Sequence, residues 1–280
     1  MDALGKFGET IIDYSIYDAY AAGIRKVVFV IRKNIEEEFN KEILDKLPSE
    51  IKTEYVFQEI GNVPGGLNYS HKRQKPWGTG HAVLTASSAI NEPFIVINAD
   101  DFYGRKSYQT AVDFFTKTKE KESRFALVGY KLNQTLSDFG FVSRGICGVD
   151  ENGFLKTIAE RTRIKREKGK IFFEDEDGEK RILSGNEIVS MNMFFFTPDI
   201  FERLEEYFKK FLKENADNLK AEFYLPFVVN NLIAENKTQV KVLPSAEKWF
   251  GLTYKEDKAS AKEKISKLIK EKKYPDKLWR

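Results

Sequence analysis

The stretch FIVINADDFYG (residues 94–104) decides the fold of this chain. Four apolar residues that lead into a polar turn are typical of a buried strand. Two adjacent aspartates, Asp100 and Asp101, then stand at the carboxyl end of that strand. Like charges this close repel each other and resist burial unless a cation or hydrogen-bond donors compensate them. The doublet therefore indicates a site where one or the other is supplied.

Strands and helices alternate around this stretch. Apolar runs of β-forming residues occupy 26–31, 53–58 and 124–132, and helical patterns occupy 35–47, 80–90 and 106–120. This alternation predicts an α/β fold of the Rossmann-like kind, with a mostly parallel sheet and helices on both faces. After about residue 138 the pattern changes to antiparallel strands, including a hairpin over 170–183 and late strands at 238–244 and 248–254. The pattern opens with a helix from Thr10, where such folds usually open with a strand.

Composition excludes several classes of protein. Lys and Arg number 46 against 43 Asp and Glu, which argues against a nucleic-acid binder because such proteins carry a clear basic excess. No apolar run approaches the ~18 residues of a membrane span, and the start of the chain is not a signal peptide. We therefore expect a cytoplasmic protein without a membrane partner. The single cysteine, Cys147, excludes an internal disulfide framework and reads as a small buried hydrophobe.

No linker or repeat divides the sequence, so we expect one domain over residues 1–280, with a C-terminal helix and tail at 257–280. Ala259, Ile265, Leu268 and Ile269 lie close to one stripe of that Lys-rich helix. The stripe favours a helix that packs on the domain over a membrane or RNA patch.

Two segments contain residues suited to binding a ligand or a metal ion. Ligands of open parallel sheets bind beyond the carboxyl ends of the strands, where Asp100 could hold Mg²⁺ or could cap a turn. In KPWGTGHAVLTAS (75–87), Gly78 and Gly80 precede a helix and are expected to leave backbone N–H groups free to approach a phosphate or a base edge. His81 lies in the first turn of that helix. It could contact a ligand, or it could simply be a polar residue at the start of the helix.

Taken in order, several segments resemble the sugar-1-phosphate nucleotidyltransferases, the NDP-sugar pyrophosphorylases. They are GETIIDYSIYDAYAAGIRKVVFVI, EYVFQ, PWGTGHAVL, INADDFYG, DFGFVSRG, IAERTR, VSMNMFFFTPDIF and KWFGLTYKEDK. The resemblance implies a nucleotide-diphospho-sugar transferase fold with an antiparallel sugar-binding extension. It also implies attack of a sugar-1-phosphate on the α-phosphorus of an NTP, with Mg²⁺ as cofactor and pyrophosphate as product. The sequence leaves the oligomeric state open, with a homo-oligomer among the alternatives.

The resemblance assigns roles to single residues. At the nucleotide end, Asp100 matches the metal-binding aspartate, Gln58 a residue that reads a pyrimidine base, and Gly78 a glycine whose backbone abuts that base. At the sugar end, Gly140 matches a backbone contact and Glu160 a carboxylate that holds hydroxyls. Arg161 stands where the family usually has a lysine for the sugar phosphate, and Asn192 lies near the expected sugar pocket. An amide such as Gln58 can offer a donor and an acceptor together, which suits uracil or thymine.

Two departures from the family pattern stand out. Met1 aligns beyond the glycine-rich triphosphate loop and the lysine after it, so we expect this chain to lack both, with unpaired backbone in the sheet and little activity. The register of WFG puts Gly251 where the family has a second metal aspartate, and Lys255 and Asp257 are the nearby replacements. The sequence thus leaves open a non-catalytic nucleotide-sugar-binding protein, and also a glycosyltransferase of the related fold.

Overall fold

The computed structural model describes residues 2–65, 67–117, 125–175, 177–252 and 254–279. Its α-helices are α1 (Ile11–Ala21), α2 (Glu36–Glu42), α3 (Thr79–Thr85), α4 (Arg105–Lys117), α5 (Ile200–Asn215), α6 (Leu225–Ala234) and α7 (Asp257–Lys270). Its strands are β1 (Lys26–Ile31), β2 (Lys52–Phe57), β3 (Phe94–Val96), β4 (Asp101–Phe102), β5 (Phe125–Lys131), β6 (Val142–Val149), β7 (Leu155–Glu167), β8 (Lys170–Glu174), β9 (Lys180–Leu183), β10 (Ile188–Phe196), β11 (Val240–Pro244) and β12 (Phe250–Gly251). None of these helices combines the length and the apolar character that crossing a membrane requires.

The main sheet has the strand order β11-β5-β10-β6-β7-β8-β9, and β3 pairs with β10 outside this path. Strand β11 is parallel to β5, whereas the pairings of β10 with β3, β5 and β6 are antiparallel. The sequence prediction of an α/β fold is confirmed. The parallel part of the sheet is smaller than expected, because β10 runs against its neighbours and interrupts the parallel pairing.

Helices cover both faces of the central strands. Alternate residues of β5 point to opposite faces, so Leu127 joins the core formed with α5 and α6, while Val128 joins the core formed with α4. The same division separates Phe194 from Phe195 in β10. Both faces of these strands are buried, and for this reason their sequences are continuous apolar runs.

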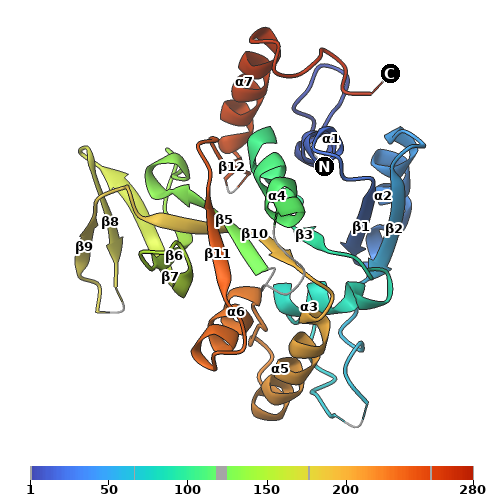
Figure 1. Cartoon of the computed structure of the whole chain (residues 1–280), viewed down its shortest axis with the longest axis vertical. Helices are drawn as coiled ribbons and strands as arrows, with labels where there is room; N and C mark the ends of the chain where they lie inside the picture. The colour runs from blue at the N-terminus through green and yellow to red at the C-terminus, as the bar shows by residue number, and fades with distance from the viewer. Residues whose placement is uncertain (1, 66, 118–124, 176, 253, 280) are drawn as a thin grey trace.

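The antiparallel extension is built from β6, β7, β8 and β9, each paired with the next. It projects to one side of the central strands, opposite the pair β1–β2 in Figure 1. This extension confirms the change of pattern after residue 138. Strand β6 joins the extension to β10 through Gly145 and Ile146, and β7 lies on the other side of β6.

Strands β1 and β2 form a separate parallel pair, and β3 pairs with β10 alone. Within the described residues, one edge of β1 and one edge of β3 therefore carry no strand partner.

Several predicted elements are shorter in the structure. The helix expected over 80–90 is the seven-residue α3 followed by a 3₁₀ turn (Ala86–Ser88), and the strand expected over 94–100 is the three-residue β3. The helix expected over 106–120 is described only as far as Lys117, and its remaining residues lie outside the described part of the chain.

The C-terminal helix and tail pack on the N-terminal segment. Ile265 of α7 is buried in a cluster with Leu4 and Phe102, and the tail adds Tyr274 to it. The predicted packed helix is confirmed, but its buried stripe runs through Ala261, because Ala259 is exposed.

The hydroxyl of Tyr274 ties the tail to α1. It donates a hydrogen bond of 2.6 Å to Oδ2 of Asp18, which is only 1% exposed. Arg105 donates to the other oxygen of the same carboxyl at 3.2 Å. Burial, more than any other cause, raises the pKa of Asp18 to about 6, and both donors oppose the rise. The tail thus supplies one of two donors to a buried carboxyl.

We expect the substitution Tyr274→Phe to lower the free energy of unfolding by about 1.5–3 kcal/mol at pH 7.5, because hydrogen bonds to charged groups contribute this much. Urea denaturation measures the change. Tyr17→Phe is the matched control, since Tyr17 lies in the same cluster and its hydroxyl forms no hydrogen bond with any of the described residues. Equal losses in the two variants would contradict the role given to the Tyr274 hydroxyl.

Candidate active site at the end of strand β3

A cleft of about 210 Å³ opens beyond the carboxyl end of β3. Its lining comes from the turn after β3 and from β6, β7 and β10, and it includes Asn98, Asp100, Asp101, Arg144, Glu160, Asn192 and Trp249. Three residues that the sequence singles out, Asp100, Glu160 and Asn192, therefore share one cleft. They lie on different elements and come together only in the folded chain.

The aspartate doublet is divided between solvent and core. Asp100 is exposed in the cleft, whereas Asp101 is buried with only 6% of its surface accessible. Oδ2 of Asp101 accepts hydrogen bonds from Nδ2 of Asn98 at 2.9 Å and from the hydroxyl of Tyr103 at 3.2 Å. Donors therefore compensate one carboxylate, and the other is left to face a ligand.

Burial sets the protonation of Asp101. It raises the pKa of this carboxyl to about 7, and the neighbouring charge of Asp100 raises it further. Asn98, Tyr103 and the positive charge of Arg144 oppose the rise. Asp101 consequently titrates near neutral pH.

Arg144 is a buried cation that our sequence analysis missed. Its guanidinium donates to the backbone carbonyls of Thr135 and Ser143 and lies 4.7 Å from the ring centroid of Trp249. Burial lowers its pKa to about 10, so it stays protonated at neutral pH. A sequence signal exists, because Val142, Arg144 and Ile146 alternate in β6 and put a charge where the pattern calls for an apolar side chain.

Glu160 and Arg161 of β7 have different surroundings. Glu160 lines the cleft and is exposed there, although partial burial raises the pKa of its carboxyl and Arg144 opposes the rise. Arg161 does not line the cleft, and its guanidinium lies 5.1 Å from the ring centroid of Phe173. Arg161 thus lies outside the cleft that Glu160 lines, and Arg144 is a cation of that cleft. The sugar-phosphate role that the resemblance gives to Arg161 stays a prediction.

Asn192 adopts an unusual backbone conformation at the cleft. Its φ of 60° lies in the left-handed region, and the pairing of β10 with β5 shifts register between Ser190 and Phe194. Asparagine tolerates this region better than most residues, yet such a conformation still costs free energy. The bulge turns the backbone of β10 at the point where it borders the cleft.

Gln58 is held in place by the segment that carries Gly78. Its Nε2 donates to the carbonyl oxygen of Gly78 at 3.0 Å and lies 3.2 Å from Nδ1 of His81. Nε2 of His81 lies 2.7 Å from the carbonyl of Asn62, so the ring must donate there and accept at Nδ1. Both amide hydrogens of Gln58 are thus used. The expectation that it offers a ligand both a donor and an acceptor is wrong, and only Oε1 remains to accept.

The two glycines of PWGTG are needed for packing against Phe223. A Cβ on Gly78 would lie 2.8 Å from the carbonyl oxygen of Phe223, and one on Gly80 would lie 2.7 Å from its ring. Gly78 also has a φ of 102°. The N–H of Gly80 donates to the carbonyl of Phe223 at 2.8 Å. The prediction that this N–H is free for a phosphate or a base is therefore wrong for Gly80.

Gly140 lies against Tyr254. A Cβ at this position would be 2.5 Å from the Tyr254 hydroxyl oxygen, which itself donates to the carbonyl of Phe141. Gly140 does not line the cleft. The close approach of Tyr254 is the physical reason for a glycine here.

Gly251 stands where the family pattern has a second metal-binding aspartate, and it adjoins Asp101. Gly251 pairs with Asp101 across β12 and β4, and a Cβ on it would lie 2.6 Å from Oδ1 of Asp101. Asp257 is occupied elsewhere, since it accepts hydrogen bonds from Ser137 and from the backbone of Tyr254. Neither Asp257 nor Lys255 lines the cleft. Within the described residues no group of three or more His, Cys, Asp or Glu is placed to hold a metal ion.

Comparison with known proteins agrees with this architecture. The model of the nucleotidyl transferase family matches residues 2–265, and the chain therefore belongs to that family. A search of curated proteins finds no significant match.

Solved structures show the same fold. A UDP-glucose pyrophosphorylase complexed with UDP-glucose gives a TM-score of 0.56 at 18% identity, covering 95% of this chain and 90% of that chain. HddC from Yersinia pseudotuberculosis complexed with GMP-PN gives a TM-score of 0.53 at 14% identity, covering 92% and 86%. The α/β fold of this chain is thus shared with these solved structures.

We expect Asp101→Asn to stabilise the fold in a pH-dependent way. The pKa of Asp101 is raised from 3.8 to about 7 on folding, so the parent protein loses stability as pH rises from about 4 to about 7. The amide keeps an acceptor for Asn98 and Tyr103 and carries no charge. Each unit of pKa difference corresponds to about 1.4 kcal/mol, so the variant should be more stable by up to about 4 kcal/mol at pH 8 and by little at pH 4.

Urea denaturation of both proteins at pH 4.5 and pH 8 measures this difference. A difference of the same size at both pH values would mean that the buried charge of Asp101 does not cause it.

Proposed function

We propose that this chain transfers a nucleotidyl group from an NTP to a sugar-1-phosphate and releases pyrophosphate. The observation that carries the proposal is the cleft itself, which joins an exposed carboxylate (Asp100), a second carboxylate (Glu160) and a buried cation (Arg144) in a member of the nucleotidyl transferase family. We treat residues 1–280 as one nucleotidyltransferase unit, since the N-terminal segment, α7 and the tail share a core.

Asp100 is the residue that would hold Mg²⁺. Mg²⁺ is usually bound by one or two carboxylates and keeps water and substrate phosphates as its other ligands, so a single exposed aspartate in a polar cleft fits it. When bound, the ion would neutralise charge on the phosphates. Asp101 is the poorer ligand, because Asn98 and Tyr103 already donate to its Oδ2.

The sugar would lie toward β7 and β10. Glu160 is placed to accept hydrogen bonds from sugar hydroxyls, and the side chain of Asn192 adds a donor and an acceptor to the same cleft. Three of the five N–H groups of Arg144 donate to backbone carbonyls, so its positive charge and the two remaining N–H groups would act on the sugar phosphate. A charge in such a poorly solvated position is screened less than one on the surface.

The base would meet Gln58 at its remaining acceptor. Oε1 of Gln58 can accept from the ring N–H of uracil or thymine, and Gly78 would offer its backbone beside the base. The role of the protein would be positioning and charge neutralisation, with the sugar phosphate as the nucleophile and no covalent intermediate.

A nucleotide-sugar-binding protein without turnover is the second candidate. Gly251 favours it, since this position adjoins Asp101 and offers no carboxylate to a second metal ion. A screen of NTPs against sugar-1-phosphates, with pyrophosphate release as the signal, tests the proposal. Release that requires both substrates and no acceptor sugar supports the transferase. Nucleotide-sugar binding without release supports the second candidate, and transfer to an acceptor sugar would indicate a glycosyltransferase.

We expect Asp100→Asn to lower Mg²⁺-dependent pyrophosphate release by at least about 100-fold, because charge stabilisation by a metal ion contributes several kcal/mol. Circular dichroism should show an unchanged fold, since the exposed amide keeps the shape of the carboxylate. Asp101→Asn is the control and should lose much less. Equal losses, or a loss only in Asp101→Asn, would reverse the assignment of the pair.

We expect Glu160→Ala to raise the KM for the sugar phosphate about tenfold, equivalent to about 1.4 kcal/mol, with the KM for the NTP unchanged. Glu167→Ala is a matched control, because Glu167 lies on the same strand and pairs with Lys180 outside the cleft. Steady-state kinetics with each substrate varied in turn measures both constants. A change confined to the NTP would remove Glu160 from the sugar site.

A further inference from the structure

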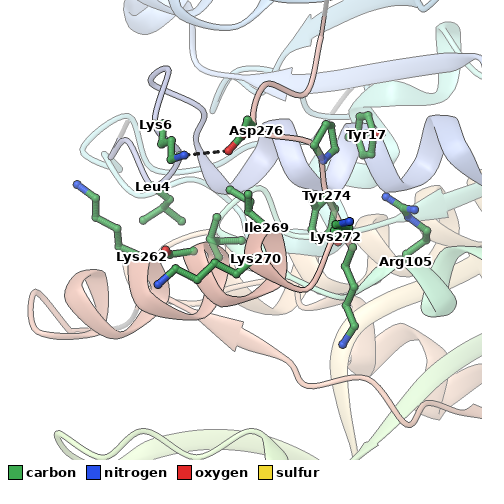
Figure 2. A pocket seen from close by; sticks show the side chains of 15 residues that line it. Leu4, Lys6, Tyr17, Arg105, Lys262, Ile269, Lys270, Lys272, Tyr274 and Asp276 are labelled. Atoms are coloured by element: carbon green, nitrogen blue, oxygen red, sulfur yellow. Dashed lines mark hydrogen bonds and ion pairs between the residues drawn. The ribbon is translucent and has the colours of Figure 1, made fainter.

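A second hollow lies on another part of the molecule, where the N-terminal segment, the start of α4, α7 and the C-terminal tail meet (Figure 2). We name it the basic pocket. Its volume is about 860 Å³, and its cations are Lys6, Arg105, Lys262, Lys270, Lys272 and Lys273. It shares no lining residue with the cleft of Asp100.

Three of the six cations in the basic pocket are paired with an acidic residue. Lys6 pairs with Asp276 at 2.9 Å, Arg105 with Asp18 at 3.2 Å and Lys273 with Glu271 at 2.9 Å. Among the described residues, Lys262, Lys270 and Lys272 form no ion pair. Like charges that converge on one hollow repel each other, and a bound anion would remove that repulsion.

Arg105 is held rigidly at the edge of the pocket. Its Nε donates to Asp18, and its guanidinium lies 5.3 Å and 5.2 Å from the ring centroids of Tyr17 and Tyr274. Its Nη2 is enclosed and has no hydrogen-bond partner within the described part of the chain. An acceptor that reached this group would satisfy a donor that the protein leaves unpaired.

The shape of the pocket favours a small molecule. Lys262 and Lys270 are eight residues apart on α7, about two helical turns, and so project from one face. Figure 2 shows them with Lys6 around Leu4 and Ile269. A ring of cations around an apolar floor suits a compact anion with an organic part, and the volume is typical of small-molecule sites.

We propose that the basic pocket binds a small molecule that carries two or more phosphate groups. Phosphate oxygens are strong acceptors, and one phosphate can meet both the fork of Arg105 and a lysine ammonium. Several phosphates are needed to reach cations on α4, α7 and the N-terminal segment together. Binding here requires no turnover at Asp100.

Titration calorimetry of the full chain with inorganic tripolyphosphate tests the site. We expect Lys262→Gln/Lys270→Gln to weaken binding about tenfold. Lys264→Gln/Lys267→Gln is the matched control, because it removes the same charge from α7 outside the pocket and should change the affinity less than twofold. Asp100→Asn should bind as the parent does, which separates this site from the proposed active site.

Hydrogen exchange gives the location independently. Bound tripolyphosphate should protect residues 257–279, which form α7 and the tail. Equal weakening in the two double variants, or no protection of this region, would overturn the proposal. Protection by anionic phospholipid vesicles or single-stranded RNA, with none by tripolyphosphate, would assign the surface to a membrane or to RNA and would equally overturn it.

Discussion

The buried carboxyl of Asp101 is the constraint on which the candidate site depends. A carboxyl with so little access to water needs donors, and Asn98 and Tyr103 supply them from the same turn. The single O–H of Tyr103 is shared between Asp101 and the carbonyl of Met191, which lies 2.8 Å away, so the turn is also fixed against β10. Because Asp101 is drawn inward, Asp100 faces the cleft. The positive charge of Arg144 reaches Asp101 and Glu160 alike and links the two sides of the site.

The same turn connects the site to the C-terminal tail. Phe102 follows Asp101 and stacks on Phe250 with ring centroids 4.5 Å apart, and its ring also meets Tyr274 at 6.1 Å. Tyr274 in turn holds the buried carboxyl of Asp18 on α1. Helix α1, the turn and the tail therefore share one core, and the tail helps to form the basic pocket on its outer side.

Much of this architecture could be predicted from the sequence. The apolar runs at 26–31 and 53–58 form β1 and β2, and both the change to antiparallel strands and the packed C-terminal helix are present. Asp100, Glu160 and Asn192, which the sequence singles out, meet in one cleft. The sequence did not show that the N–H of Gly80 bonds to Phe223, or that Arg144 lines the cleft, because a motif gives only the order of residues along the chain. The direction of each side chain depends on strand register, and the state of each N–H depends on the loop packed against it.

The sequence by itself determined which segments form strands and helices, and it placed a carboxylate after β3. Both results depend on side-chain periodicity and turn residues, which involve only residues close together in the chain. Only the tertiary structure decided which aspartate of the doublet is buried and which arginine joins the cleft. Those outcomes depend on Gly251 and Trp249, about 150 residues after the doublet, and on Arg144 of β6. Burial of a charge is set by every chain segment that excludes water from it. No local stretch of sequence contains that information.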